Sequence, residues 1–571
     1  MPKYEDESVN ILIGGEAGQG LVTVGQLLAK SLVMSGYHIL VSQDYMSRIR
    51  GGHNTFAIRV DNKEVKAPIE RIDVLVALTE ETISLHRDEM SDNAVVIADE
   101  EIDTGDVSAL KVPFDDLAPR PIFENVAALG VVASVLGMDR EVPAGLITET
   151  FKKKGQDVID KNRKVLDDAC DWVEKQDGKG VKLPEAGERD RRLMIDGNQA
   201  IALGAMAAGV RFCAFYPMTP STSIPLTFIA NKDNMGIVVE QAEDEIAAIN
   251  MCLGASFAGA RAMAATSGGG FALMTEGVSL AGITETPIVI ALAQRPGPAT
   301  GLPTRTEQGD LNLVLYSGHG EFPRAVFAPG TLEEYFNLTY HAFDLAERFQ
   351  TTIFILTDQY MADSLRGTQP FDLDSLPEIS QPDTSDGGED YKRYEVTESG
   401  VSPRKLPGFG KHLVGADSDE HDEQGHITES GEVRNAQNEK RLKKGCGIFE
   451  EVREPTLIGE DGADILLVCW GSTRGSAEEA AEMLSADGKK AAVLHFAQVW
   501  PLNPEHFVDK LESAGKVVCV EGNAGGQFAK LIRRETGFNV ENLVLRYDGR
   551  PFTAKYIIDR IESPDGPEVC A

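Results

Sequence analysis

Tyr216-Pro-Met-Thr-Pro-Ser-Thr-Ser223 and Glu240-Gln-Ala-Glu-Asp-Glu245 are the two stretches that decide the fold of this chain. The first follows an apolar segment, and its prolines stiffen a loop rich in Ser and Thr hydroxyls. The second opens a helix rich in Ala and Gly, which we predict over residues 246–260. A rigid hydroxyl loop beside carboxylates at the start of an apolar helix is typical of a pocket for a cofactor and an anion.

Predicted strands alternate with helices along most of the chain, which indicates an α/β fold with mainly parallel sheets covered on both faces. Gly-rich loops follow two of the C-terminal strands, at 471–475 and 521–526. The strands are predicted at 9–13, 38–41, 55–60, 74–78, 94–98, 211–215, 237–239, 262–265, 288–292, 351–357, 463–469, 491–496 and 517–520.

Changes in composition divide the chain into four segments. Residues 1–185, 190–375 and 456–571 each carry the alternating pattern of an α/β domain. Residues 376–455 are polar, acidic from 417 to 432 and basic at 440–444, so we predict an extended charged connection with room for a hairpin. Such a length suggests either a tether or a functional loop.

Bulk composition excludes several classes of partner. The 571 residues carry a net charge of −35, which disfavours nucleic acid and anionic membranes as partners. No apolar run is long enough to span a membrane, and no secretory signal is evident, so we expect a cytoplasmic protein. The 7 cysteines are scattered without a Cys-x-x-Cys pair, which disfavours disulfides or an iron–sulfur cluster held by this chain alone.

Two N-terminal motifs are candidates for anion binding. Gly15, Gly18 and Gly20 lie between a predicted strand and a helix, where backbone N–H groups attract anions. Their spacing is not that of a dinucleotide-binding loop, and both phosphate contact and a simple tight turn remain open. Arg48 and Arg50, beside paired glycines, suit either phosphate recognition or pairing with an acidic surface.

In the middle of the chain, Thr219 and Ser221 lie in the hydroxyl loop, which has more hydroxyls than a helix cap at Ser221 or Thr222 needs. We therefore favour a pocket for an anion or carbonyl. Glu245 abuts apolar residues, so its carboxylate is expected to be partly desolvated and able to share a proton with a ring nitrogen. Thiamine diphosphate requires such a carboxylate at its aminopyrimidine ring.

Three further motifs accompany these. Ser267 and Gly268 follow a predicted strand at the sheet edge where ligands bind, although a plain glycine turn is the alternative. Arg295 and Arg305 lie on stiff Pro/Gly loops and suit carboxylate binding, with salt bridges as the alternative. The acidic run 419–426 contains two histidines, but we favour a solvated loop over a metal site.

A magnesium-binding Gly-Asp-Gly…Asn pattern is absent from the sequence. If a thiamine cofactor binds, this chain therefore provides only the half of the site that faces the pyrimidine. We predict no metal ligands in this chain.

Taken together, these motifs resemble the α subunit of the 2-oxoacid:ferredoxin oxidoreductases, in the form with a γ domain fused at the N-terminus. The resemblance covers essentially the whole chain. Met218 stands where the family usually has isoleucine, and Gly269 where it often has proline. The motifs that carry the resemblance are Gly14-Gly-Glu-Ala-Gly-Gln-Gly20, Arg50-Gly-Gly-His-Asn54, Tyr216-Pro-Met-Thr-Pro220, Thr266-Ser-Gly-Gly-Gly270, Gln294-Arg-Pro-Gly-Pro298 and Gly301-Leu-Pro-Thr-Arg305.

The resemblance implies a γ-like domain, a pyrimidine-binding domain of the thiamine type and a domain like the transketolase C-terminal domain. It also implies thiamine diphosphate with Mg²⁺ shared with a β subunit, a [4Fe–4S] cluster in that subunit, coenzyme A as co-substrate, ferredoxin as electron acceptor and an (αβ)2 heterotetramer.

By motif, the resemblance implies roles for individual residues. Glu245 would be the partner of the aminopyrimidine ring, Thr219 would bind the 2-oxoacid, and Arg295 its carboxylate. Arg305 would reach the same carboxylate or a distal one. The further implied contacts are Ser221 with substrate, Pro217, Ser267 and Gly268 with thiamine diphosphate, and Gly15, Gly18, Gly20 and Arg50 with coenzyme A.

The form with the fused γ domain resembles the 2-oxoglutarate enzymes most. The implied reaction is the reversible, coenzyme A-dependent oxidative decarboxylation of 2-oxoglutarate to succinyl-CoA and CO2, and in reverse it fixes CO2, as in a reductive TCA cycle. Pyruvate, or a broad range of 2-oxoacids, is the runner-up. Alternatives from other classes are a non-catalytic CoA-binding or electron-transfer scaffold and a dinucleotide oxidoreductase.

Overall fold

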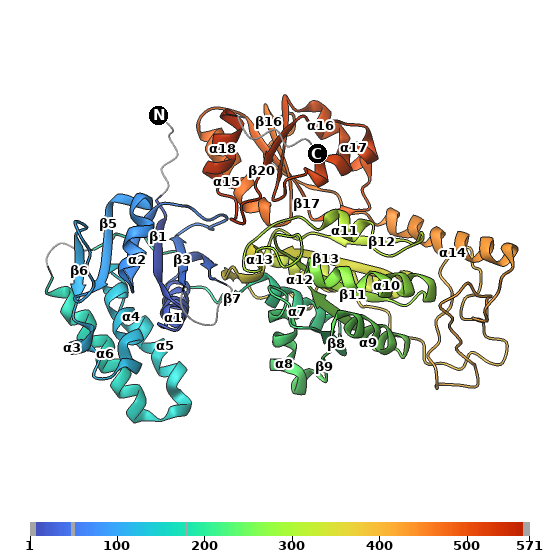
Figure 1. Cartoon of the computed structure of the whole chain (residues 1–571), viewed down its shortest axis with the longest axis horizontal. Helices are drawn as coiled ribbons and strands as arrows, with labels where there is room; N and C mark the ends of the chain where they lie inside the picture. The colour runs from blue at the N-terminus through green and yellow to red at the C-terminus, as the bar shows by residue number, and fades with distance from the viewer. Residues whose placement is uncertain (1–6, 47–51, 177–179, 564–571) are drawn as a thin grey trace. The chain divides into compact units, whose positions relative to one another are not determined.

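The computed structural model describes residues 7–46, 52–176 and 180–563, except for the side chain of Pro121 (Figure 1). The chain forms two compact units. Unit 1 comprises Met1–Ile195 and Asp363–Pro370, and unit 2 comprises Asp196–Ala362 and Phe371–Ala571.

Unit 1 contains an eight-stranded sheet with the order β6-β5-β4-β1-β3-β2-β14-β7. Strands β1, β4, β5 and β6 are parallel, whereas β3, β2, β14 and β7 pair antiparallel with their neighbours. Phe56, Ile58 and Val60 occupy alternate positions of the strand predicted at 55–60, and all three are fully buried. The strands are β1 (Val9–Glu16), β2 (His38–Asp44), β3 (His53–Asp61), β4 (Ile72–Ala77), β5 (Met90–Asp99), β6 (Ala109–Val112), β7 (Leu193–Ile195) and β14 (Arg366–Thr368).

Apolar helix faces complete the core of unit 1. Leu21, Val24, Leu28 and Leu32 of the first helix are all buried, as their helical spacing predicts. The helices are α1 (Leu21–Met34), α2 (Glu80–His86), α3 (Phe114–Leu117), α4 (Glu124–Val135), α5 (Glu141–Phe151) and α6 (Gln156–Glu174).

The larger sheet of unit 2 has seven strands in the order β18-β12-β13-β11-β10-β8-β9. Every pair of neighbours is parallel except β12 and β18, which agrees with the predicted mainly parallel sheet. Its strands are β8 (Phe212–Phe215), β9 (Val238–Gln241), β10 (Ala262–Thr266), β11 (Ile288–Gln294), β12 (Arg324–Phe327), β13 (Thr352–Asp358) and β18 (Gln498–Trp500). The accompanying helices are α7 (Gly197–Ala207), α8 (Ser223–Met235), α9 (Glu245–Phe257), α10 (Gly268–Thr284), α11 (Leu311–Leu315), α12 (Leu332–Phe349) and α13 (Gln359–Asp363).

The second sheet of unit 2 has five strands in the order β15-β17-β16-β19-β20. Trp470 and Phe496 of this sheet share one buried cluster with Phe271 and Phe354 of the larger sheet and its helices, so one hydrophobic core joins the two sheets. The remaining elements are β15 (Thr456–Ile458), β16 (Ile465–Trp470), β17 (Ala491–Phe496), β19 (Lys516–Glu521), β20 (Asn542–Leu545), α15 (Arg474–Ala486), α16 (Val508–Ser513), α17 (Gln527–Thr536) and α18 (Ala554–Glu562).

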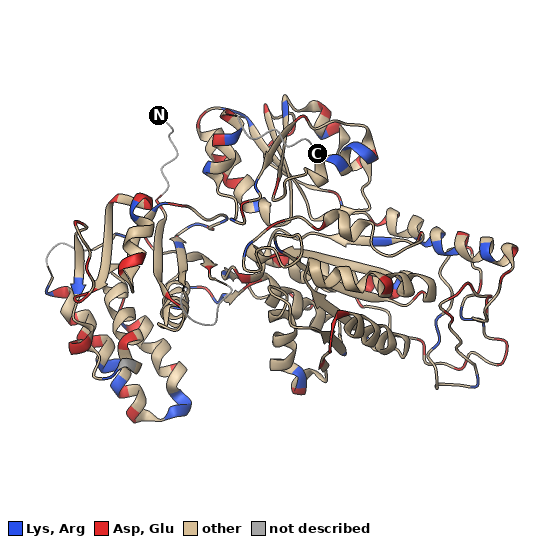
Figure 2. Ribbon diagram, viewed as in Figure 1, with Lys and Arg blue, Asp and Glu red and all other residues tan. Residues whose placement is uncertain are grey.

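The polar connection contains a helix that the sequence analysis did not predict, α14 (Gly431–Glu450). Basic residues lie along it (Figure 2), and three of them, Lys440, Arg441 and Lys444, are buried. Two of these three pair with one buried carboxylate. Lys440 Nζ lies 2.6 Å from Glu285 Oε1, and Lys444 Nζ lies 2.8 Å from Glu285 Oε2. The expected hairpin is limited to one antiparallel bridge between His421 and Ile427.

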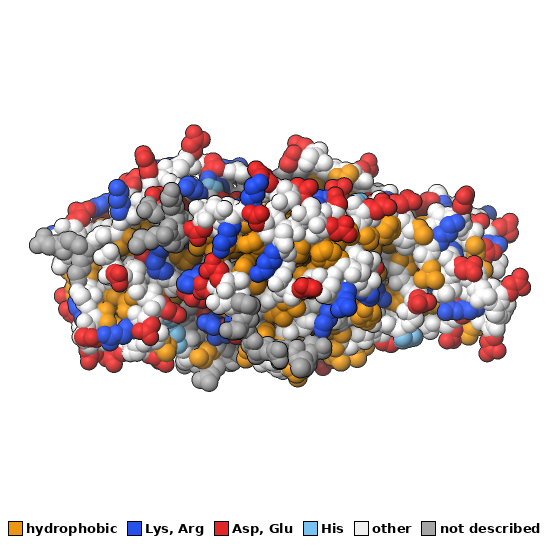
Figure 3. Space-filling view, turned by 90° about the horizontal axis from the view of Figure 1, so that it is seen from above, with side chains coloured by type: hydrophobic (Ala, Val, Ile, Leu, Met, Phe, Trp, Pro, Cys, Tyr) orange, Lys and Arg blue, Asp and Glu red, His pale blue; other side chains and the backbone are white. Residues whose placement is uncertain are grey.

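Acidic side chains are spread over the face shown in Figure 3, interspersed with basic ones. Among the described residues, no helix is both long and apolar enough to cross a membrane.

Candidate functional site

The candidate site lies at the carboxyl edge of the seven-stranded sheet. Because β8, β9, β10 and β11 are parallel neighbours, the segments that follow them meet at this edge, where ligands of such sheets bind. The Ala242 N–H donates to the Phe215 carbonyl at 2.8 Å and so joins the two stretches that the sequence analysis singled out.

Glu245 is the first residue of α9, and its side chain turns inward. It is only 3% exposed, and its Oε1 atom has no hydrogen-bond partner among the described residues. Burial and the neighbouring charge of Asp244 raise the pKa of Glu245. Asp244 caps the helix by accepting from the Ala247 N–H at 2.7 Å, whereas Glu240 and Glu243 are exposed. Of the four carboxylates, the Glu245 side chain is therefore the one shielded from solvent, as the sequence analysis predicts.

The glycines at the start of α10 make room for two carboxylates. A Cβ on Gly270 would lie 2.4 Å from Glu245 Oε1, and a Cβ on Gly268 would lie 2.3 Å from Asp310 Oδ2. Gly269, between them, has nothing nearer than 3.7 Å. Ser267 occupies the N-cap position without a side-chain cap bond, and its hydroxyl is buried with no hydrogen-bond partner among the residues that the structure describes.

The hydroxyl loop faces Arg295. The Arg295 Nη1 group donates to the Thr219 carbonyl at 2.7 Å, and the Thr219 hydroxyl makes no hydrogen bond within the described part of the chain. The Ser221 hydroxyl donates to the Met218 carbonyl at 2.8 Å. Neither suggested cap forms, because Thr222 occupies the N-cap position of α8 without a side-chain bond.

The loop after β11 carries three perturbed groups. Burial lowers the pKa of Arg295, an effect that Asp310 opposes. Burial raises the pKa of Asp310 to about 6 against the opposing effect of Arg295, and burial and Asp310 raise that of Glu307 to about 7. Arg305 lies where this loop meets Gly549, since a Cβ on Gly549 would be 2.9 Å from Arg305 Cβ.

Gln308 is a structural residue of this loop that sequence reasoning missed. It is 2% exposed and lies between the Gly-rich loops that follow β16 and β19. Its Nε2 donates to the Trp470 carbonyl at 2.8 Å, and its Oε1 accepts from the Gly522 N–H at 2.8 Å. The signal available in the sequence was the pair of Gly-rich loops, which leave space for a buried amide.

The Gly14–Gly20 loop of unit 1 borders a pocket of about 310 Å³. Gly18 and Gly20 both adopt left-handed conformations, with φ of 98° and 83°. The charged residues that line the pocket are all acidic: Asp99, Glu101, Asp115 and Glu124. These carboxylates would repel a phosphate group inside the pocket. Arg48 and Arg50 lie outside the described residues.

The acidic run 419–426 is ordered by contacts within unit 2. Glu420 pairs with Arg434 at 2.6 Å and with Arg441 at 2.8 Å, and the buried His421 ring packs on Tyr394. Within the described ranges, no group of His, Cys, Asp and Glu side chains could hold a metal ion.

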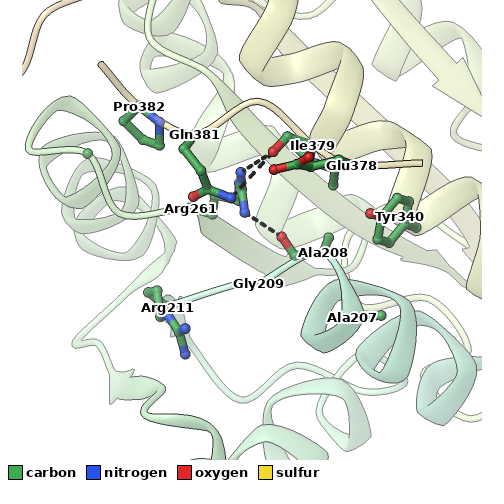
Figure 4. Close-up of a pocket in the computed structure, with 11 residues that line it drawn as sticks. Ala207, Ala208, Gly209, Arg211, Arg261, Tyr340, Glu378, Ile379, Gln381 and Pro382 are labelled. Atoms are coloured by element: carbon green, nitrogen blue, oxygen red, sulfur yellow. Dashed lines mark hydrogen bonds between the residues drawn. The ribbon is translucent and has the colours of Figure 1, made fainter. Parts of the chain in front are cut away.

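A second pocket of about 320 Å³ lies at the opposite edge of the sheet, before β8 and β10 (Figure 4). Arg261 fills part of it, with Nη1 donating to the Ala208 carbonyl at 2.8 Å and Nη2 to the Ser380 carbonyl at 2.9 Å. The arginine thus fastens the start of the polar connection to the end of α7, away from Glu245.

Three family models match the chain. Residues 203–440 match the thiamine diphosphate-binding domain of the pyruvate flavodoxin/ferredoxin oxidoreductases, and residues 10–172 match the pyruvate ferredoxin/flavodoxin oxidoreductase domain. Residues 456–549 match the transketolase C-terminal domain. The fold is therefore α/β with the three kinds of domain that the resemblance implied.

Whole-chain relatives agree with these matches. The chain is 32% identical, over 95% of its length and 94% of the relative's, to the 2-oxoacid:ferredoxin oxidoreductase subunit alpha of a Sulfolobus species. Over 60% of its length and 90% of the relative's, it is 34% identical to the 2-oxoglutarate synthase subunit KorA of Archaeoglobus fulgidus. The chain also resembles a solved 2-oxoglutarate:ferredoxin oxidoreductase from Magnetococcus marinus, which has 2-oxoglutarate, coenzyme A and succinyl-CoA bound. The two superpose with a TM-score of 0.90 at 28% identity, over 98% of this chain and 99% of that one.

Proposed function

Since the chain belongs to the α subunits of the 2-oxoacid:ferredoxin oxidoreductases, we propose that it forms the pyrimidine side of a thiamine diphosphate site with Glu245 as the proton partner of the ring. The observation that carries the proposal is the buried Glu245 Oε1 atom, which has no partner among the described residues. A buried carboxylate with a raised pKa is suited to share a proton with a ring nitrogen.

The residues at this edge fit the cofactor. Within the described part of the chain, Glu245 Oε1 and the Ser267 hydroxyl are both buried without hydrogen-bond partners, and polar groups of a bound ring would satisfy them. When bound, thiamine diphosphate supplies a carbon acid and an electron sink for cleaving the bond beside a keto group. In this proposal Pro217 and Gly268 line the same ring pocket.

Substrate binding is assigned to the groups around the hydroxyl loop. The Thr219 hydroxyl donates to the 2-oxoacid, and the Arg295 guanidinium binds its carboxylate. Ser221 contributes from the same turn, where its hydroxyl oxygen can still accept a hydrogen bond. Arg305 is the candidate for a second, distal carboxylate.

We assign 2-oxoglutarate as the substrate, with coenzyme A as acyl acceptor, succinyl-CoA and CO2 as products and ferredoxin as electron acceptor. The KorA relatives and the Magnetococcus marinus enzyme support this choice by their names. Pyruvate or a broad 2-oxoacid range is the alternative. The reaction is reversible, and its reverse fixes CO2, as in a reductive TCA cycle.

A partner subunit completes the site in this proposal. A β subunit provides the diphosphate and Mg²⁺ positions and a [4Fe–4S] cluster, in a cytoplasmic (αβ)2 complex. Exposed apolar side chains on the elements around Glu245 are available to such a partner: Leu226, Ile229, Val238, Ile246, Met251 and Leu273. Coenzyme A is assigned to unit 1, with Gly15, Gly18, Gly20 and Arg50 as candidate contacts and with its phosphates outside the acidic pocket that the glycine loop borders.

The test is Glu245→Gln in the complex assembled with its partner subunit. Loss of the carboxylate removes the proton partner, so turnover of 2-oxoglutarate with coenzyme A and viologen should fall at least about 100-fold. Glu243→Gln is the matched control, since Glu243 belongs to the same cluster but is exposed. Equal turnover by the two variants would refute the role of Glu245. Preference for pyruvate over 2-oxoglutarate would refute only the substrate assignment.

A further inference from the structure

A second carboxylate, that of the partly buried Asp310, lies at the edge of the site and has no role in the chemistry described above. It packs so closely on the first turn of α10 that only glycine fits at position 268. Its Oδ2 atom is buried and has no hydrogen-bond partner in the described part of the chain. The Asp310 N–H donates to Gln294 Oε1 at 3.0 Å, which holds the residue at the end of β11.

The charged groups around Asp310 are few. Arg295, which follows β11, attracts the carboxylate but forms no ion pair with it among the described residues. Glu307, three residues earlier in the same loop, is a like charge that Asp310 perturbs. Glu245 lies at the other end of the same glycine turn, against Gly270. Arg295 is therefore the cation that offsets the burial of an ionised Asp310.

Binding of an anion changes this balance. A buried carboxylate oxygen without a donor is costly when ionised, because nothing replaces the water that it has lost. An anion on Arg295 neutralises the offsetting charge and places a like charge near Asp310. Both effects favour the neutral carboxyl group.

We propose that Asp310 takes up one proton from solvent, on Oδ2, when an anionic substrate binds beside Arg295. Substrate binding by this subunit is thus coupled to protonation, and Asp310 is a positioning residue that leaves the full charge of Arg295 to the substrate. The inference rests on the proposed function only for the identity of the anion, a 2-oxoacid.

The direction of the pKa shifts agrees with this geometry. Burial raises the pKa of Asp310 to about 6 against the lowering effect of Arg295, so the group is mostly ionised near neutral pH. When the Arg295 charge is neutralised, this pKa rises further. Anion affinity should then be constant below a pH of about 6 and fall as pH increases above it, because binding must draw a proton from solvent.

The test is isothermal titration calorimetry of the assembled complex with oxalate, in two buffers of different ionisation enthalpy at about pH 7. Oxalate has the shape of a 2-oxoacid head group but no ketone that can react. The difference between the two buffers gives the number of protons taken up. Asp310→Asn keeps the shape and removes the titrating group, Glu307→Gln is the control on the same loop, and Asp233→Asn is an exposed control on α8.

We expect proton uptake on oxalate binding in the wild type and in both control variants, and none in Asp310→Asn. Asp310→Asn should bind oxalate about tenfold more tightly than wild type near pH 8 and with equal affinity near pH 5, from the cost of one nearby charge. Thermal melting identifies a variant that fails to fold, in which case Asp310→Ser is the substitute.

Three results would overturn the inference: no proton uptake by the wild type, equal uptake by Asp310→Asn, or loss of uptake in Glu307→Gln. The last would assign the proton to Glu307. Turnover is scored separately. A complex that turns over 2-oxoacid without proton-linked oxalate binding refutes this inference alone, whereas proton-linked binding without Glu245-dependent turnover refutes the proposed function alone.

Discussion

Adding one methyl group at Gly270 should disable the site while leaving the fold intact. The Cβ of Gly270→Ala would lie 2.4 Å from Glu245 Oε1 and 2.3 Å from Thr266 Oγ1. Ordinary contacts between such atoms are longer by roughly 1 Å, so both neighbours must move by about that amount or the turn itself must shift. Thr266 is the last residue of the buried strand β10, whereas the Glu245 side chain can rotate. We therefore expect Glu245 to be displaced.

The magnitude follows from this displacement. A shift of about 1 Å in a reacting group costs on the order of 100-fold in rate. Overpacking of this kind costs about 1–3 kcal/mol of folding stability. Gly269→Ala is the matched control, because its Cβ meets nothing nearer than 3.7 Å and alanine favours a helix over glycine by up to about 1 kcal/mol.

The assay is 2-oxoglutarate-dependent viologen reduction by the complex, with urea unfolding of each variant. Gly270→Ala should lose about 100-fold in kcat/KM, and Gly269→Ala should keep the wild-type rate with equal or slightly higher stability. Wild-type turnover by Gly270→Ala would show that the carboxylate position is unimportant. Equal losses in both variants would show that the helix start, not Glu245, was damaged.

Two further predictions concern the framework of unit 2. Glu285→Gln leaves Lys440 and Lys444 buried without their anion, so the free energy of unfolding measured in urea should fall by about 3–5 kcal/mol. The control Lys443→Gln changes an exposed position and should alter this free energy by less than about 0.5 kcal/mol. Burial alone would raise the pKa of Glu285, but Lys444, Lys440 and Arg393 outweigh it and hold the pKa at about 2. The stability that Glu285 contributes should therefore be complete above about pH 4.5 and decline as the pH falls towards 2. A stability deficit of Glu285→Gln that stays constant between these pH values would contradict the assignment. Gln308→Ala leaves the Gly522 N–H without its acceptor and should lower stability by about 1–3 kcal/mol; an unchanged melting temperature together with unchanged turnover would refute its role as a link between loops.

The sequence allowed most of the parallel framework to be predicted, although β6, β12 and β20, which pair in parallel with β5, β13 and β19, were missed. The strand predicted at 491–496 coincides with β17, and that predicted at 262–265 is one residue shorter than β10. Buried strands bounded by glycine and polar residues carry strong local signals. The short strands β14 and β18 carry no such signal, because each pairs with partners far away in the sequence.

The helix α14 was missed for a related reason. Its basic residues were interpreted as part of an extended charged connection, yet Lys440 and Lys444 are buried against Glu285, more than 150 positions earlier in the chain. Only the tertiary fold brings that carboxylate to the helix. A charge run therefore predicts a solvated face only where no buried counter-ion exists.

The candidate site divides along the same line. Glu245 was identified from the apolar residues that follow it in sequence, although Ile246 is itself exposed and the first turn of α10 packs against the Glu245 carboxylate. Asp310 and Gln308 were missed because segments distant in sequence pack against them. Gly268 packs on Asp310, and the loop at Gly522 packs on Gln308. Local sequence thus reveals a buried carboxylate at a helix start, but not one that a loop folds against another helix.

The glycine turn of α10 brings two opposing effects to bear on the same pair of carboxylates. The positive end of the helix dipole favours the ionised forms of Glu245 and Asp310. The burial of one oxygen of each carboxylate, without a hydrogen-bond partner in the described part of the chain, favours their neutral forms. Because the two effects oppose each other, the protonation of Asp310 is expected to respond to a change in the charge at Arg295. A side chain at position 268 or 270 would separate the carboxylates from the helix and remove that balance, and this is the physical reason that glycine is required at both positions.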